Sequence, residues 1–351
     1  MTKNQKNYGE AKVKPLDKSR IEIIGNIPPE IWENYRAQAL KEVNDSVTID
    51  GFRKGMVPEN ILISKVGEMA ILEEMAELAM TPAYMDIVIE NKIDAIGRPD
   101  IQITKLASGN PIEFKIVSAI VPTVTLPEYK KIAVEEVKKQ NPDDVKVTEK
   151  DIEDTITRIL SETESADTAA DRSDHKTLAT KNELNDDFVK KLGAFSSVSD
   201  FKEKLKEMIA QQKKDQAIEK LRIQIAENIS SASTIDLPDI MVDSETSRIE
   251  AQFGGDIERM GVKLEDYLKH SKKTIEDLRK EWRPHAEKKA KLQLILNAIA
   301  DKEKLRPSKD EIEHEVKHIL EHYKDADHEQ AHSYAETVLT NEKVFQFLES
   351  K

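Results

Sequence analysis

The sequence contains no cysteine, and this absence excludes several classes of protein. A chain without thiols has no disulfide scaffold, no cysteine nucleophile and no zinc site with thiolate ligands. Aromatic residues are scarce as well, at 5% of the 351 residues, whereas charged residues reach 34%. This balance is typical of long, water-exposed helices and is unlike a compact enzyme with an aromatic-lined pocket.

Long apolar runs are also missing. No stretch approaches the ~18 consecutive apolar residues of a membrane-spanning helix, and the N-terminus has no apolar segment of the kind found in signal peptides. We therefore expect a soluble, cytoplasmic protein without a membrane partner. The net charge of −13 argues against a general nucleic-acid binder, although the first twenty residues are basic, which fits either an anionic partner or a solvated tail.

Motifs for catalysis or cofactor binding are absent from the sequence. It contains no P-loop, no GxGxxG motif and no Ser/His/Asp order of the kind found in catalytic triads. Gly254-Gly255 lacks the flanking strand and helix of a nucleotide-binding loop. His314, His318 and His322 recur at every fourth residue, a spacing that can bind zinc. Their helix is acidic and matches no metalloprotease pattern, so a solvated helix face is the favoured interpretation. We predict no catalytic residue, no cofactor and no metal site.

One short stretch, residues 47–58, is unlike the rest of the chain. Two glycines bracket an aromatic residue and two cations, and a proline closes the segment: Gly51, Phe52, Arg53, Lys54, Gly55 and Pro58. Glycine permits backbone angles that other residues avoid and proline fixes its own φ, so we expect a stiff, exposed loop. A solvent-facing ring beside two cations suits docking on a partner, with the ring as the anchor and the cations for phosphate or acidic groups. A connecting loop whose phenylalanine folds back into the core is the alternative.

Residues 1–125 have the pattern of an α+β domain. Alternation and β-branched residues predict strands, and apolar residues at helical spacing predict helices: 20–27, 101–103 and 114–120 as strands, 29–43 and 61–79 as helices. Pro82 is expected to interrupt the second helical pattern. Helices gathered against a small antiparallel sheet give an α+β fold.

The middle of the chain is predicted to be a connector. Residues 126–160 include an alternating segment at 129–139, which predicts an extended chain, and then a helix whose start is marked by Thr148. Residues 161–182 are polar and show no periodicity, which predicts a flexible linker.

Residues 183–351 show helical periodicity throughout, which predicts an all-α C-terminal domain with helical arms and an elongated molecule. Gly254-Gly255 is expected to end one helix, and Ser308 with Glu311 forms a capping box that starts another. Most apolar stripes are expected to form the core.

The stretch Gly-Phe-Arg-Lys-Gly-Met-Val-Pro at residues 51–58 resembles the ribosome-docking signature of trigger factor, the bacterial ribosome-associated chaperone, usually Gly-Phe-Arg-x-Gly-Lys-x-Pro. Phe52, Arg53 and Lys54 stand where the family places its docking triplet. Met56 replaces a usual cation, which implies weaker docking or a greater dependence on Arg53 and Lys54. Other segments follow the family's order and spacing: Leu237-Pro238-Asp239, residues 264–269, Leu278-Arg279, Arg283-Pro284-x-Ala286-Glu287 and Ser308-x-x-Glu311-Ile312. The resemblance covers nearly the whole chain apart from residues 161–182.

This resemblance implies an ATP-independent chaperone that docks on ribosomal protein and rRNA at the polypeptide exit tunnel. The N-terminal ribosome-binding domain and the C-terminal arms would shield unfolded nascent polypeptides, and the free protein could form a homodimer. The family also carries an FKBP-type prolyl isomerase domain between a helix like 148–160 and a segment like 184–193. Because this chain has no aromatic residue between Tyr129 and Phe188, we expect that domain to be absent.

Three alternatives stay open from the sequence. The chain could be a prolyl isomerase, which catalysis of a proline-limited refolding reaction would reveal. It could be a ribosome-free cytoplasmic holdase or assembly factor, a possibility suggested by Met56. It could also be a purely structural helical scaffold, which would leave the loop at residues 51–58 unexplained.

Overall fold

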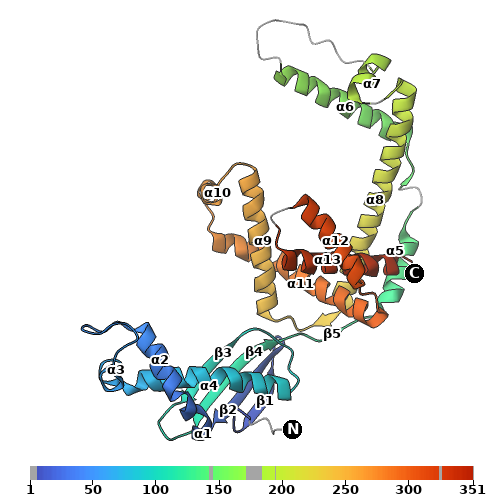
Figure 1. The fold of residues 1–351 in the computed structure, drawn as a ribbon. Helices are drawn as coiled ribbons and strands as arrows, with labels where there is room; N and C mark the ends of the chain where they lie inside the picture. The colour runs from blue at the N-terminus through green and yellow to red at the C-terminus, as the bar shows by residue number, and fades with distance from the viewer. Residues whose placement is uncertain (1–5, 142–144, 171–183, 194, 324–325, 351) are drawn as a thin grey trace. The chain divides into compact units, whose positions relative to one another are not determined.

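The computed structural model describes residues 6–141, 145–170, 184–193, 195–323 and 326–350 (Figure 1). The chain divides into two compact units, and each unit is built from two separate stretches. Residues 1–125 and 234–294 form the first unit, and residues 126–233 and 295–351 form the second.

A four-stranded antiparallel sheet organises the first unit, with its strands in the order β1-β2-β4-β3. The strands are β1 (Ala11–Leu16), β2 (Arg20–Ile27), β3 (Ala95–Lys105) and β4 (Ile112–Ile120). The central pair, β2 and β4, alternates as a half-buried sheet should, and Ile23 of β2 lies opposite Ile116 of β4 with both side chains buried. The three predicted strand segments are therefore confirmed.

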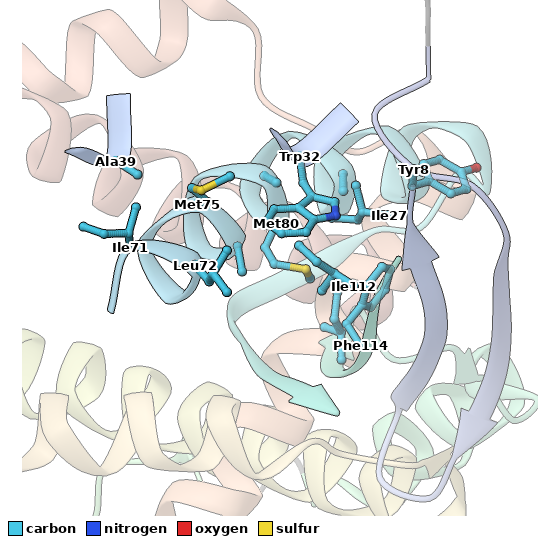
Figure 2. Close-up of a cluster of buried hydrophobic side chains, with 14 of the residues drawn as sticks. Tyr8, Ile27, Trp32, Ala39, Ile71, Leu72, Met75, Met80, Ile112 and Phe114 are labelled. Carbon is cyan, nitrogen blue, oxygen red and sulfur yellow. The ribbon is translucent and has the colours of Figure 1, made fainter. Parts of the chain in front are cut away.

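Helices cover one face of this sheet, which confirms the α+β fold of the N-terminal region. They are α1 (Pro29–Trp32), the 3₁₀ turn η1 (Glu33–Tyr35), α2 (Arg36–Ser46), α3 (Glu59–Val66) and α4 (Glu68–Glu90). Figure 2 shows Trp32 and Met80 gathered with Ile112 and Phe114 in the shared core. The Trp32 indole N–H donates to the Asn110 carbonyl at 3.1 Å, so this buried ring keeps its polar atom satisfied.

Pro82 lies inside α4, and the predicted interruption there is wrong. Proline removes one helical hydrogen bond, but it does not stop a helix that is held along its length by tertiary packing. α4 has that support, because Met75, Ala79, Ala83 and Ile87 are all buried in the core around Pro82.

The remainder of the first unit consists of β5 (Val124–Thr125) and residues 234–294. β5 pairs with β6 (Thr234–Ile235), and α9 (Asp239–Arg259), α10 (Leu264–Ser271) and α11 (Ile275–Glu303) follow, α11 belonging to this unit up to residue 294. The prediction that Gly254-Gly255 ends a helix is wrong, because α9 continues to Arg259. The stop signal is Gly261, whose φ of 76° permits the terminal turn in which its N–H donates to the Glu258 carbonyl.

The second unit is helical, which confirms the predicted helical C-terminal region. Its helices are α5 (Tyr129–Lys139), α6 (Glu149–Ala170), α7 (Asp186–Leu192), α8 (Val198–Ala232), α12 (Lys309–His322) and α13 (His328–Glu349), together with the end of α11. The predicted capping box of Ser308 and Glu311 starts α12. Arg222 of α8 forms an ion pair with Glu342 of α13 at 2.7 Å, which connects two helices that are far apart in the sequence.

The predicted extended segment at residues 129–139 is helix α5 instead. Ile132, Val134 and Val137 suggested alternation, but the buried positions are Tyr129, Ala133 and Glu136, at helical spacing. Because one of the buried positions is a glutamate, a search for apolar residues at helical spacing does not find this buried face. Its carboxylate is satisfied by the Lys139 ammonium at 2.5 Å.

The predicted linker at residues 161–182 is wrong over its first ten residues. α6 continues to Ala170, so residues 161–170 are helical, while residues 171–182 lie outside the described residues. α6, α7 and the start of α8 share a small core of their own that includes Phe188, Val189 and Phe201. The Phe195 and Phe201 rings meet edge to face at 5.1 Å within it.

None of the described helices combines the length and the apolar character that crossing a bilayer requires.

Candidate functional site

The loop at residues 47–58 connects α2 to α3 and consists largely of two consecutive turns (Figure 1). The Phe52 N–H donates to the Ile49 carbonyl at 3.1 Å, and the Met56 N–H donates to the Arg53 carbonyl at 2.9 Å. The third residue of each turn is a glycine with positive φ, 88° at Gly51 and 79° at Gly55. Turns with positive φ at this position strongly favour glycine, so the backbone explains both glycines.

Asn44, near the end of α2, fixes the second turn. Its side-chain amide donates to the Val57 carbonyl at 2.8 Å, and its side-chain oxygen accepts from the Val57 N–H at 3.1 Å. Its backbone carbonyl also accepts from the Gly55 N–H at 3.2 Å. Val57 itself is buried in the core, so the loop has both polar and apolar anchors. Asn44 carries no local sequence signal, because its side chain bonds a backbone 13 positions away.

The two glycines are constrained to different degrees. A β-carbon at Gly55 would lie 2.5 Å from the Asp45 carboxylate, whereas a β-carbon at Gly51 would meet nothing within 4 Å. Pro58 adds stiffness at the other end, because it is the N-cap of α3 and holds φ at −60°. The backbone of the loop is therefore defined by glycine turns, an asparagine anchor and a terminal proline.

The side chains between these anchors face solvent. Phe52 is 37% exposed and lies outside the buried core, so the alternative in which its ring folds inward is wrong. Arg53 and Lys54 are exposed, and within the described part of the chain neither forms an ion pair. Met56 is 71% exposed, more than Phe52. The loop thus displays an aromatic ring, two available cations and a methionine on a fixed backbone.

Two carboxylates, one within the loop and one beside it, offset its cations. Asp45 and Asp50 are exposed, and with Arg53 and Lys54 they bring the formal charge of residues 44–58 to zero. An ion pair also supports the helices behind the loop. Arg36, at the start of α2, donates to Glu68 of α4 at 2.6 Å, and this hydrogen bond is the largest cause of a raised Arg36 pKa.

The basic N-terminal segment is partly neutralised within its own unit. Lys6 lies 2.5 Å from Glu90, and Lys18 lies 2.8 Å from Asp239. Hydrogen bonds from these lysines are the largest cause of the lowered pKa of each carboxyl group. These pairs make the segment a weaker candidate for binding an anionic partner than its sequence suggests.

The histidines of α12 lie on an exposed helix face. The His318 and His322 rings approach within 4.8 Å, centre to centre, and His314 is exposed one turn earlier. Across the residues that the structure describes, no group of three or more histidine or acidic side chains is arranged to hold a metal ion.

A second exposed apolar feature lies at the turn between α9 and α10. Met260 is 76% exposed and Val262 is 40% exposed, on either side of Gly261. Three half-buried rings from α9, α10 and α11 pack together: Phe253 lies 5.3 Å from Tyr267 and 5.2 Å from Trp282, between ring centres. These ring contacts form a small local core among α9, α10 and α11, while Met260 stays exposed.

Two family models match the chain. The model described as bacterial trigger factor protein matches residues 10–159, and the model of the bacterial trigger factor protein C-terminus matches residues 197–348. The interval between them, residues 160–196, is shorter than the about 50 residues of the smallest usual domains.

Curated trigger factors are similar over most of the chain. The protein of Halothermothrix orenii is 26% identical across 88% of this chain and 90% of its own length, and that of Moorella thermoacetica is 25% identical across 88% and 86%. The first alignment spans 390 positions, more than the 351 residues of this chain, so the relative has residues that this chain lacks.

A solved structure of the trigger factor chaperone, described for promiscuous substrate recognition in folding and assembly activities, has a related fold. It superposes with a TM-score of 0.54 over 98% of this chain and 100% of the solved chain, at 16% identity. Such a low identity supports the fold alone. Together with the two models, which match the N-terminal and C-terminal parts in order, these likenesses place this chain in the trigger factor family.

Proposed function

We propose that this protein is an ATP-independent chaperone that docks on the ribosome at the polypeptide exit tunnel and shields nascent chains. Ribosomal protein and rRNA would be its docking partners, unfolded polypeptides its clients, and the cytoplasm its location. The free protein would be able to form a homodimer, as its family resemblance implies.

The observation that carries this proposal is the constrained geometry of the loop at residues 51–58. Binding hot spots are enriched in aromatic residues and arginine, and a site costs less to occupy when its backbone is already ordered. Phe52, Arg53 and Lys54 meet both conditions, because they are exposed between glycine turns that Asn44 fixes to α2. A loop that merely connected two helices would have no need of this arrangement.

Client binding needs apolar surface that stays uncovered in the free protein. Met260 and Val262 provide such surface on the α9–α10 turn, and Met208 on α8 is 65% exposed. Methionine suits this task, because its unbranched and polarisable side chain adapts to many partners. Weak contacts at several such positions would let a client leave and fold.

Co-sedimentation with ribosomes tests the docking role. Replacing Phe52, Arg53 and Lys54 together by alanine should lower ribosome affinity about thirtyfold, the loss of one ~2 kcal/mol hot spot. The matched control removes one exposed aromatic residue and two exposed cations from α12 and α13 through Tyr334→Ala, Lys309→Ala and Lys317→Ala. Equal pelleting of the triple-alanine variant and the wild type would refute docking through this loop.

We further propose that the protein does not catalyse prolyl isomerisation. The support is the short interval between the two matched models and the small core that α6, α7 and α8 form around Phe188 and Phe201. In a refolding assay limited by proline isomerisation, the protein should leave the rate constant of the slow phase unchanged. A slow phase that becomes faster in proportion to protein concentration would contradict this proposal.

A ribosome-free holdase or assembly chaperone is the second candidate function. The observation that favours it is the zero formal charge of residues 44–58, which weakens long-range attraction to the ribosome. This candidate predicts that the wild type fails to pellet with ribosomes but still suppresses aggregation of an unfolded client.

A further inference from the structure

Met56 and Phe52 occupy equivalent places in the two turns of the loop. Each is the fourth residue of its turn, and each donates its N–H to the first residue of that turn. Both are apolar and exposed, at 71% for Met56 and 37% for Phe52. The repeat of four residues therefore displays two apolar side chains, with Arg53 and Lys54 between them.

The charge around these side chains offers little attraction for a polyanion. Asp45 and Asp50 cancel the formal charges of Arg53 and Lys54, and residue 56 adds none. Binding to nucleic acid depends on cations that replace the counterions of phosphates, and residues 44–58, with no net formal charge, have no excess of cations to contribute. An apolar protein surface matches the displayed side chains better.

We propose that Met56 is a second apolar anchor of the loop and that the loop docks, through Phe52 and Met56, on an apolar surface of a ribosomal protein instead of on rRNA phosphates. This inference rests on the proposed ribosome docking. Arg53 and Lys54 then contact polar groups at the rim of the interface, where charges mainly affect orientation and association rate.

The structure supports Met56 as an anchor in two further ways. Its high exposure leaves most of its apolar area available for burial, and burial of apolar area drives association. Its backbone is already held, because Met56 lies between Gly55, which bonds to Asn44, and Val57, which bonds to the same residue. Only the side chain loses freedom on binding, which lowers the entropic cost of docking.

Ribosome affinity of the full-length protein, measured over a series of salt concentrations, tests this inference. Met56→Ala should weaken binding about tenfold, as expected for loss of one buried methionine, while Met56→Leu should stay within about twofold. Met85→Ala is the matched control, because Met85 is 51% exposed on α4, away from the loop in the sequence, and it should bind as the wild type does.

Salt dependence distinguishes a protein surface from rRNA. The logarithm of wild-type affinity should fall with the logarithm of salt concentration with a slope shallower than about −1, and Met56→Lys should bind more weakly than the wild type. A wild-type slope near −2, with tighter binding by Met56→Lys at low salt, would establish phosphate contacts and overturn the inference.

The triple-alanine variant at residues 52–54 separates two kinds of failure. If that variant loses binding while Met56→Ala binds as the wild type does, docking stands and the second anchor is refuted. If neither change affects binding, the docking proposal itself fails.

Discussion

The loop at residues 47–58 and the turn between α9 and α10 share one local feature but are held in different ways. In each, an exposed methionine adjoins a glycine with positive φ: Met56 follows Gly55, and Met260 precedes Gly261. The loop adds a side-chain anchor at Asn44 and two available cations. The α9–α10 turn is held by backbone hydrogen bonds that end α9.

Under the proposed function, this difference separates a surface for one partner from a surface suited to many. A backbone fixed by side-chain hydrogen bonds presents its ring and cations in one geometry, which favours a specific contact. A methionine at a helix end keeps its rotamers and can follow irregular apolar shapes. We therefore assign docking to the loop and client contact to the turn, and the following changes test that assignment.

The largest effect is expected from Asn44→Ala. It removes two side-chain hydrogen bonds to the backbone of buried Val57, and unpaired buried groups should lower the free energy of unfolding by about 3 kcal/mol. Chemical denaturation measures this loss, and ribosome affinity should fall with it although no displayed side chain has changed. Asn44→Asp, which keeps only an acceptor, should lose about half as much.

Arg259→Ala is the counterpart beside the α9–α10 turn. The Arg259 side chain is 78% exposed, and its loss should change the free energy of unfolding by less than about 0.5 kcal/mol. If Asn44→Ala were equally mild, the loop would not owe its geometry to a side-chain anchor, and the contrast between the two regions would disappear.

A smaller effect is expected from alanine at the two glycines. Gly55→Ala and Gly261→Ala both force a β-carbon into positive φ, which costs about 1–2 kcal/mol. Gly55→Ala should be at the upper end, because its β-carbon would also displace the Asp45 carboxylate, whereas space around Gly261 is open. Thermal unfolding measures both losses, and only Gly55→Ala should lower ribosome affinity. Equal affinities for the two variants would contradict the assignment of docking to the loop.

The sequence was a good guide to the loop because its turns are local. Positive φ, a fixed proline and a displayed ring all follow from residues within a few positions of one another, so Gly51, Gly55 and Pro58 could be interpreted without a structure. Asn44 could not be found in this way, because its role depends on a backbone that folding brings to it.

The incorrect predictions elsewhere have the same origin in tertiary context. One buried position of α5 is Glu136, which forms an ion pair with Lys139. Because a glutamate is not counted as apolar, the sequence of α5 resembled the alternating pattern of a strand. Pro82 stays inside α4 because packing in the core holds that helix. Gly254 and Gly255 do not end α9. The helix continues to Arg259 and ends before Gly261, whose φ of 76° allows the terminal turn to form.

The smallest effect is expected at the α9–α10 turn, from Met260→Ala combined with Val262→Ala. Contact with a loosely packed client buries only part of each side chain, so suppression of client aggregation should weaken about threefold while ribosome affinity stays unchanged. Met56→Ala should behave in the opposite way, with lower ribosome affinity and unchanged suppression in the absence of ribosomes. Because both variants remove an exposed methionine, this reciprocal pattern could not arise from a general loss of apolar surface. If both variants impaired the same activity, the two turns would share one function, and the division between docking and client binding would be wrong.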